Sequence, residues 1–255
     1  MKELRSFFYK IPISMTCRLS TGNIRLNNYF IPIQISIILL LFSSGCKNTC
    51  QQKAENGEGY ITYKISYAED NPYKNNRFLP GETTLVFKGI KASFFTSGMG
   101  IIHMVNLLDN EHKKYTSLLI NSFGDNYAFT EVPEDIIKQE NDPKYTFELT
   151  EEKKIIAGLV CNKAIVKDIT NKSKFDIYCY KKMKVILGSS PYKDFNYLLM
   201  EYKDTRFGLP MQLLATKANL SPVDTILLNL EERGEYNWVD RKTFLSVINH
   251  LKFPG

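Results

Sequence analysis

Apolar and polar residues alternate along many short segments of this chain. In the clearest of them, Ile61, Tyr63 and Ile65 alternate with polar residues, which is the period-two pattern of a half-buried strand. Similar segments recur between turn-forming residues such as Pro80-Gly81. We predict further strands at 83–88, 92–97, 101–107, 115–121, 127–131, 145–149, 154–156, 159–167, 175–181, 197–202, 211–217 and 225–231. Strands at this spacing indicate a sandwich or barrel rather than parallel βαβ units.

Two segments have helical rather than strand character. Residues 133–140 begin with proline and acidic residues, which suit the first turn of a helix. Residues 240–252 begin with the good N-cap Asp240 and place Phe244, Val247, Ile248 and Leu251 on one face. We therefore expect a single, mainly β domain over 59–255, with an antiparallel sheet and two helices.

The N-terminus carries a different pattern. A basic segment precedes the uncharged apolar run 29–42, which is too short to span a bilayer comfortably and is followed by Ser43-Ser44-Gly45-Cys46. This ending resembles a bacterial lipobox, with Ser43 where leucine is usual, and it implies lipidation of Cys46. We predict a lipoprotein signal peptide at 1–45 and a flexible tether at 46–58. Either Met1 or Met15 is the start.

The net charge of +6 does not point to a further function. Residues 1–45 contain five basic residues and one acidic residue, so most of the excess belongs to the predicted signal peptide. The remaining domain is close to neutral, and no nucleic-acid partner is expected.

Residues with catalytic potential are sparse. The chain has three histidines and contains no HExxH motif, paired CxxC motifs or phosphate-binding loop. No nucleophile lies beside a suitable base in the sequence. We therefore expect no catalytic residues, no metal site, no cofactor and no enzymatic activity. A glycan-active hydrolase is the alternative, although a single tryptophan, Trp238, and the lack of a separated acid pair disfavour it.

Two short motifs carry a resemblance to a known family. They are Ile156-Ala157-Gly158 followed by Cys161, Lys163 and Ala164, and later Gly208-Leu209-Pro210. Together they resemble the GLPGLI family of Bacteroidetes envelope proteins, although Met211-Gln212 replaces the second Gly-Leu. The resemblance implies an architecture similar to the LolA/LolB class, which is an incomplete antiparallel barrel or strongly curved sheet with about two helices packed in or against it and an apolar cavity. Gly158 and Gly208-Leu209-Pro210 then either shape the cavity mouth or serve only as turn residues. Thr225 lies in an Asp-Thr-Ile sequence that resembles an O-glycosylation acceptor of Bacteroidetes exports.

Cys161 and Cys179 lie on two consecutive predicted strands. If residues 169–171 form the turn between them, Cys161 lies directly opposite Cys179. Opposed residues are close enough for a disulfide, and the envelope permits disulfides. The alternatives are two buried thiols, or a register shifted by one residue that separates them.

Two functions fit this sequence. The first is a lipid-anchored envelope protein that binds a lipid, an acyl chain or a hydrophobic protein segment without catalysis. The second is a structural or interaction lipoprotein of the outer membrane with a packed core and no cargo. In both cases the N-terminal lipid attaches the protein to the membrane. The lack of an acidic cluster after Cys46 favours the periplasmic face of the outer membrane.

Overall fold

The computed structural model describes residues 57–68, 79–98, 102–122, 124–131, 144–185, 187, 191–206, 209–232 and 234–252. The chain divides into two units, Met1–Gln51 and Gln52–Gly255, and the described residues all belong to the second. The predicted signal peptide, Cys46, the helix at 133–140 and Gly208 lie outside the described residues. Among the helices that the structure describes, none has the length and apolar character needed to cross a membrane.

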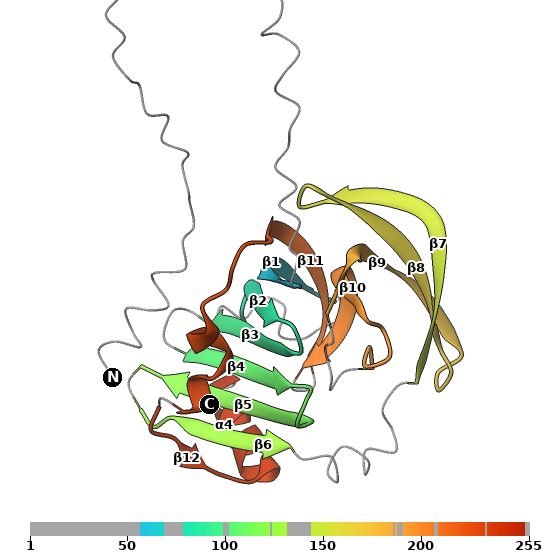
Figure 1. The fold of residues 1–255 in the computed structure, drawn as a ribbon. Helices are drawn as coiled ribbons and strands as arrows, with labels where there is room; N and C mark the ends of the chain where they lie inside the picture. The colour runs from blue at the N-terminus through green and yellow to red at the C-terminus, as the bar shows by residue number, and fades with distance from the viewer. Residues whose placement is uncertain are drawn as a thin grey trace, which may run out of the picture. The chain divides into compact units, whose positions relative to one another are not determined.

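The described part of the chain is mainly β, as expected (Figure 1). The strands are β1 (Glu58–Tyr67), β2 (Glu82–Lys88), β3 (Lys91–Gly98), β4 (Ile102–Asp109), β5 (Lys114–Asn121), β6 (Tyr127–Glu131), β7 (Tyr145–Ile156), β8 (Leu159–Asp168), β9 (Ser173–Lys184), β10 (Tyr197–Arg206), β11 (Leu209–Asn219) and β12 (Asn237–Trp238). Two short 3-10 helices, η1 (Thr225–Leu228) and η2 (Leu230–Glu232), precede the α-helix α4 (Arg241–Lys252).

All twelve strands belong to one sheet, in the order β12-β6-β5-β4-β3-β2-β1-β11-β10-β9-β8-β7. Strands β1 to β6 and strands β7 to β11 form two antiparallel meanders, and β1 pairs with β11 to join them. Only the short β12 runs parallel to its neighbour, β6. The sheet is open, because β7 and β12 are its unpaired edges, and it is curved (Figure 1). The described residues thus form neither a sandwich nor a closed barrel, and they contain one α-helix rather than the two expected.

The alternation of apolar residues decides which face of each strand is buried. On β1, Ile61 and Tyr63 are fully buried and Ile65 is 6% exposed, whereas Lys64 between them is exposed. The main core cluster includes buried residues of β1, β2, β3, β8, β9, β10 and β11. A separate cluster forms where Phe244 and Ile248 of α4 pack on Leu119 of β5. The helix prediction at 240–252 is thus confirmed, and Asp240 caps it by accepting a 2.7 Å hydrogen bond from the Thr243 amide.

Two strand predictions were wrong. Residues 145–149 and 154–156 belong to one strand, β7, because a bulge between Leu149 and Lys153 interrupts the pairing with β8 but not the strand. Residues 225–231 form η1 and part of η2 instead of a strand. The Asp224 carboxylate caps η1 by accepting a 3.0 Å hydrogen bond from the Ile226 amide, and this local contact stabilises the helical turn. β1 begins at Glu58, the last residue of the predicted tether, and residues 46–56 of that segment lie outside the described residues.

The turn between β7 and β8 explains one motif residue. Ala157 has φ 49° and Gly158 has φ 80°, and two successive positive φ angles are typical of a type I′ hairpin turn. Gly158 adopts this conformation at little steric cost because it lacks a Cβ.

Candidate functional site

A large cavity lies against strands from both meanders and against α4. It has a volume of about 1090 Å³. Its lining includes residues of β1, β3, β4, β5, β6, β7, β9, β10, β11 and α4. Residues on β7, at one edge of the sheet, and on β6, next to the other edge, both contribute, and this is a consequence of the curvature of the sheet. Its aromatic and charged lining residues are Tyr67, Phe94, Tyr115, Phe129, Glu131, Tyr145, Phe175, Tyr202, Lys203, Asp204, Arg206, Arg241 and Phe244.

A buried ion pair at the end of β10 contributes to this lining. The Arg206 Nε atom lies 2.7 Å from Asp204 Oδ2, and the two side chains are 17% and 9% exposed. The Arg206 Cζ atom also lies 3.9 Å from the centroid of the Phe94 ring, a cation–π contact. Burial alone would lower the pKa of Arg206, but the Asp204 carboxylate and the neighbouring Tyr202 and Tyr63 hydroxyls together outweigh it and raise that pKa. Arg206 therefore remains charged inside the cavity.

Tyrosines pack beside this ion pair. Tyr202 is 2% exposed, and its buried hydroxyl lies beside the Arg206 guanidinium, although their contact is not a hydrogen bond of good geometry. Burial raises the pKa of Tyr202, and the Arg206 charge only partly offsets this effect. Tyr63 and Tyr192 contact the Tyr202 ring edge-on, and each donates its hydroxyl to a main-chain carbonyl on β10. The Tyr202 hydroxyl thus interacts with Arg206, whereas the Tyr63 and Tyr192 hydroxyls bind main-chain carbonyls.

A second, smaller pocket of about 100 Å³ adjoins the cavity. Its lining is mostly aliphatic and includes Ile65, Leu79, Ile102, Met104, Leu119, Leu209 and Ile248. Tyr67, Asn106, Arg206 and Met211 line both the cavity and this pocket. Arg206 therefore lies at the boundary between a large polar–aromatic space and a small apolar one.

Two further charged contacts lie in the lining of the cavity. Lys203 Nζ lies 5.4 Å from the centroid of the Phe175 ring. The Arg241 side chain of α4 lies 3.4 Å from a Glu131 carboxylate oxygen on β6 and is half exposed. The lining therefore contains three basic residues and two acidic ones.

The motif residues divide between the cavities and the turns. Leu209 lines the small pocket and pairs with Arg206 on β10. Pro210 lines the large cavity and pairs with Thr205 on β10. Gly158 lies in the β7–β8 turn and lines neither of them. The structure thus brings part of the second motif to the cavity and leaves the first motif in a hairpin.

The predicted strand register for the cysteines was wrong. Cys179 lies opposite Asn162, not Cys161, because the β8–β9 turn contains four residues and Asp168 pairs with Ser173. Both cysteines are free and fully buried in the main core. Burial raises the pKa of Cys161 to about 11 and that of Cys179 to about 12, so both are neutral thiols. The geometric argument for a disulfide therefore fails.

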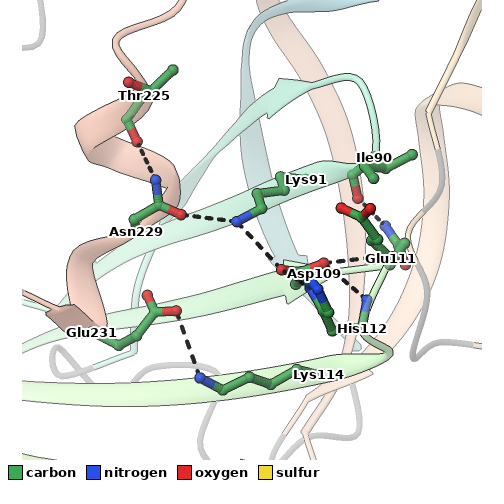
Figure 2. A network of polar contacts seen from close by, with 10 residues as sticks. Ile90, Lys91, Asp109, Glu111, His112, Lys114, Thr225, Asn229 and Glu231 are labelled. Atoms are coloured by element: carbon green, nitrogen blue, oxygen red, sulfur yellow. Dashed lines mark hydrogen bonds and ion pairs between the residues drawn. The ribbon is translucent and has the colours of Figure 1, made fainter.

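A second polar cluster surrounds Asp109 at the β4–β5 turn (Figure 2). The Asp109 carboxylate accepts hydrogen bonds from the Glu111 and His112 amides at 3.1 and 3.2 Å. It also lies 3.3 Å from Lys91 Nζ and 2.9 Å from His112 Nδ1. Burial would raise the pKa of Asp109, but these partners outweigh it and lower the pKa to about 2.

This cluster has the composition of a cation site but is occupied by protein contacts. One ligand atom each from Asp109, Glu111 and His112 lie within 4.8 Å of one another. However, both Asp109 oxygens already accept hydrogen bonds, and Lys91 supplies the positive charge. Lys91 also donates to Asn229 at 3.0 Å, and Asn229 donates to the Thr225 carbonyl at 3.2 Å (Figure 2). The cluster therefore connects η1 to the sheet, while the Thr225 side chain remains exposed.

The sequence analysis missed the residues at the centre of the cavity. Tyr202, Asp204 and Arg206 lie two residues apart on β10, and such spacing places them on one face of a strand. The predicted strand ended at Tyr202, before the two charged residues. Charged residues that continue the apolar face of a strand were the signal that was available.

No protein-family model matches this chain, and no curated protein matches it. Among solved structures, two of PNGF-II, in space groups P21 and C2, are similar to it at 18% identity. The matches cover 76% of this chain and 34% and 33% of the PNGF-II chains, with TM-scores of 0.46 and 0.44. This chain thus spans about a third of the length of PNGF-II. We draw no structural or functional conclusion from a likeness at this level, and the resemblance to the GLPGLI family stays a prediction.

Proposed function

We propose that this protein is a non-enzymatic binding module that holds a lipid, an acyl chain or a hydrophobic protein segment. The observation that carries this proposal is the cavity of about 1090 Å³, whose lining combines aromatic and aliphatic side chains with a few polar and charged ones. Ligand sites are typically concave and largely preformed, with apolar walls and a few polar groups that orient the ligand. An incomplete-barrel architecture of the LolA/LolB class, which the motifs imply, suits the same role.

Narrowing the cavity tests this function directly. Ser66 is an exposed strand residue that lines the cavity, and tryptophan at this position fills space without displacing a buried side chain. We expect Ser66→Trp to weaken the binding of a fluorescent fatty acid by about tenfold, which corresponds to about 1.4 kcal/mol. The measurement is a fluorescence titration of the exported protein.

Ser173→Trp is the matched control. Ser173 is also an exposed strand serine, at the start of β9, and it does not line the cavity. This variant should bind the fatty acid as the unchanged protein does. If neither the unchanged protein nor the control takes up the probe, the binding function is wrong.

We also propose that the protein is a lipoprotein of the cell envelope, anchored through Cys46 at the periplasmic face of the outer membrane. Cys46→Ser should then leave an unprocessed precursor that a palmitate analogue does not label. Labelling of this variant at the level of the unchanged protein would contradict the lipid anchor. It would leave the binding function open, because the cavity lies in a separate part of the chain.

A second candidate is an interaction lipoprotein that docks a partner on its surface. Ile155 and Val160 lie directly opposite each other on β7 and β8 and are 72% and 48% exposed. Exposed apolar side chains that lie together are typical of contact surfaces. Under this alternative, Ile155→Lys abolishes co-purification of a membrane partner, whereas Ser66→Trp does not.

A further inference from the structure

We propose that the ligand of this cavity is an amphiphile with an anionic head, which Arg206 binds, and one linear apolar chain, which enters the small pocket. This inference rests on the proposed binding function and specifies the chemical class of its ligand. It follows from the surplus of hydrogen-bond donors around Arg206 and from the position of Arg206 between two different spaces.

The donor surplus comes from the way the ion pair is bonded. Asp204 Oδ1 accepts a 2.8 Å hydrogen bond from the Thr205 amide, and Oδ2 accepts the 2.7 Å bond from Arg206 Nε. A guanidinium group has five N–H donors. The bond to Asp204 uses only the Nε donor, and the neighbouring Tyr202 hydroxyl can accept from no more than part of the terminal amino groups. The acid of the pair is thus satisfied on both oxygens, whereas the base is not.

The N–H groups of Arg206 that Asp204 does not use favour a ligand with acceptor oxygens. The neighbouring Tyr202 hydroxyl lies on the same strand face, but it is almost completely buried and interacts with Arg206 rather than with a ligand in the cavity. A carboxylate or phosphate suits the Arg206 donors best, because charge-assisted bonds to arginine are strong and frequently bidentate.

The apolar part of the ligand follows from the neighbouring pocket. Arg206 lines this pocket, whose remaining lining is mainly aliphatic. Its volume of about 100 Å³ is below the ~150 Å³ of a cavity that admits a benzene ring, so a linear chain end fits better than a ring. A head group on Arg206 therefore places the first part of an attached chain at the entrance to the pocket.

The test is calorimetric titration of the exported protein with four probes: octanoate, octyl phosphate, octan-1-ol and inorganic phosphate. We expect octanoate or octyl phosphate to bind at least about tenfold more tightly than octan-1-ol, because a hydrogen bond to a charged group contributes at least that factor. Whichever of the two binds more tightly identifies the head group. Inorganic phosphate should bind more weakly than both, because it lacks the chain.

Three variants separate a binding role of Arg206 from a structural one. Arg206→Met should weaken octanoate binding about tenfold and leave octan-1-ol binding unchanged. Asp204→Asn should strengthen octanoate binding, because it removes the competing carboxylate. Arg241→Met is the matched control: Arg241 also lines the cavity and also pairs with an acid, but at 3.4 Å and half exposed, so octanoate binding should change less than twofold.

The outcomes distinguish this inference from the function on which it rests. Equal binding of octanoate and octan-1-ol overturns the anionic head and leaves the binding function standing. Equal binding of octanoate and inorganic phosphate overturns the apolar chain. If none of the chain-bearing probes binds, both proposals fail. The comparison of probes on the unchanged protein needs no variant, so a folding defect in Arg206→Met does not prevent the test.

Discussion

The Asp109 carboxylate connects three parts of the chain, and replacing it by asparagine measures what its charge contributes to stability. Asparagine has the same shape and keeps one acceptor oxygen for the Glu111 and His112 amides. It loses the ionic contacts with Lys91 at 3.3 Å and with His112 at 2.9 Å (Figure 2). The expected result of Asp109→Asn is therefore a loss of the charge-dependent part of the network alone.

The magnitude follows from the pKa of Asp109. Hydrogen bonds to His112 and Lys91 outweigh the effect of burial and lower this pKa from 3.8 to about 2. At about 1.4 kcal/mol per pKa unit the full effect would be about 2.5 kcal/mol. The turn is open to solvent, and screening reduces this value. We expect Asp109→Asn to lower the free energy of unfolding by about 1 kcal/mol at pH 7.

The sign of the pH dependence follows from the lowered pKa. The carboxylate stabilises the folded state above its unfolded-state pKa of 3.8, and this contribution disappears as the pH falls towards 2. The difference between the two proteins should thus fall to roughly a third by pH 2.5. Urea denaturation at pH 7, 4 and 2.5 measures it. Asp125→Asn, in an exposed turn, is the control that should change nothing. A stability difference that stays constant from pH 7 to 2.5 would refute the electrostatic explanation.

Three further predictions concern the core and one turn. Cys161 and Cys179 should react with iodoacetamide at pH 8 at least about 100-fold more slowly in the native protein than in urea. The reason is that burial raises their pKa values to about 11 and 12 and so leaves few reactive thiolates. Equal rates in the two states would contradict their burial. Tyr63→Phe should lower the free energy of unfolding by about 1–2 kcal/mol, because it removes a buried 2.7 Å hydrogen bond, whereas Tyr60→Phe should cost less. Gly158→Ala should lower the free energy of unfolding by about 1 kcal/mol because of the φ of 80° alone, since no atom lies within 4 Å of the added methyl group. An unchanged midpoint of thermal unfolding would exclude this backbone strain.

Much of the sheet was predictable because each strand carries its own evidence. The alternation at Ile61 and Tyr63 predicted β1, and the segment 127–131 matches β6 at both ends. The error at 225–231 has a local cause, since apolar residues in that segment also suit a 3-10 turn once Asp224 caps it. A period-two pattern in a short segment does not distinguish these cases.

The cavity residues were harder to predict because they come from distant parts of the chain. Phe94 and Arg206 are more than a hundred positions apart, and only the β1–β11 pairing brings their meanders into one sheet. The strand that carries Arg206 was correctly located, but its charged end was interpreted as the end of the strand. Nothing in the spacing of Asp204 and Arg206 indicates which aromatic ring they meet.

The sequence by itself determined most of the strands, their buried faces and the helix α4, because these depend on residues that are neighbours in the chain. The tertiary structure alone decided the register of β8 and β9, and with it that Cys179 lies opposite Asn162 rather than Cys161. It also decided the curvature that places β6 and β7 around one cavity. The physical reason is that a shift of one residue in register or a small change in sheet twist hardly alters the local pattern. Such a change nevertheless moves side chains to the other face or to the other end of the site.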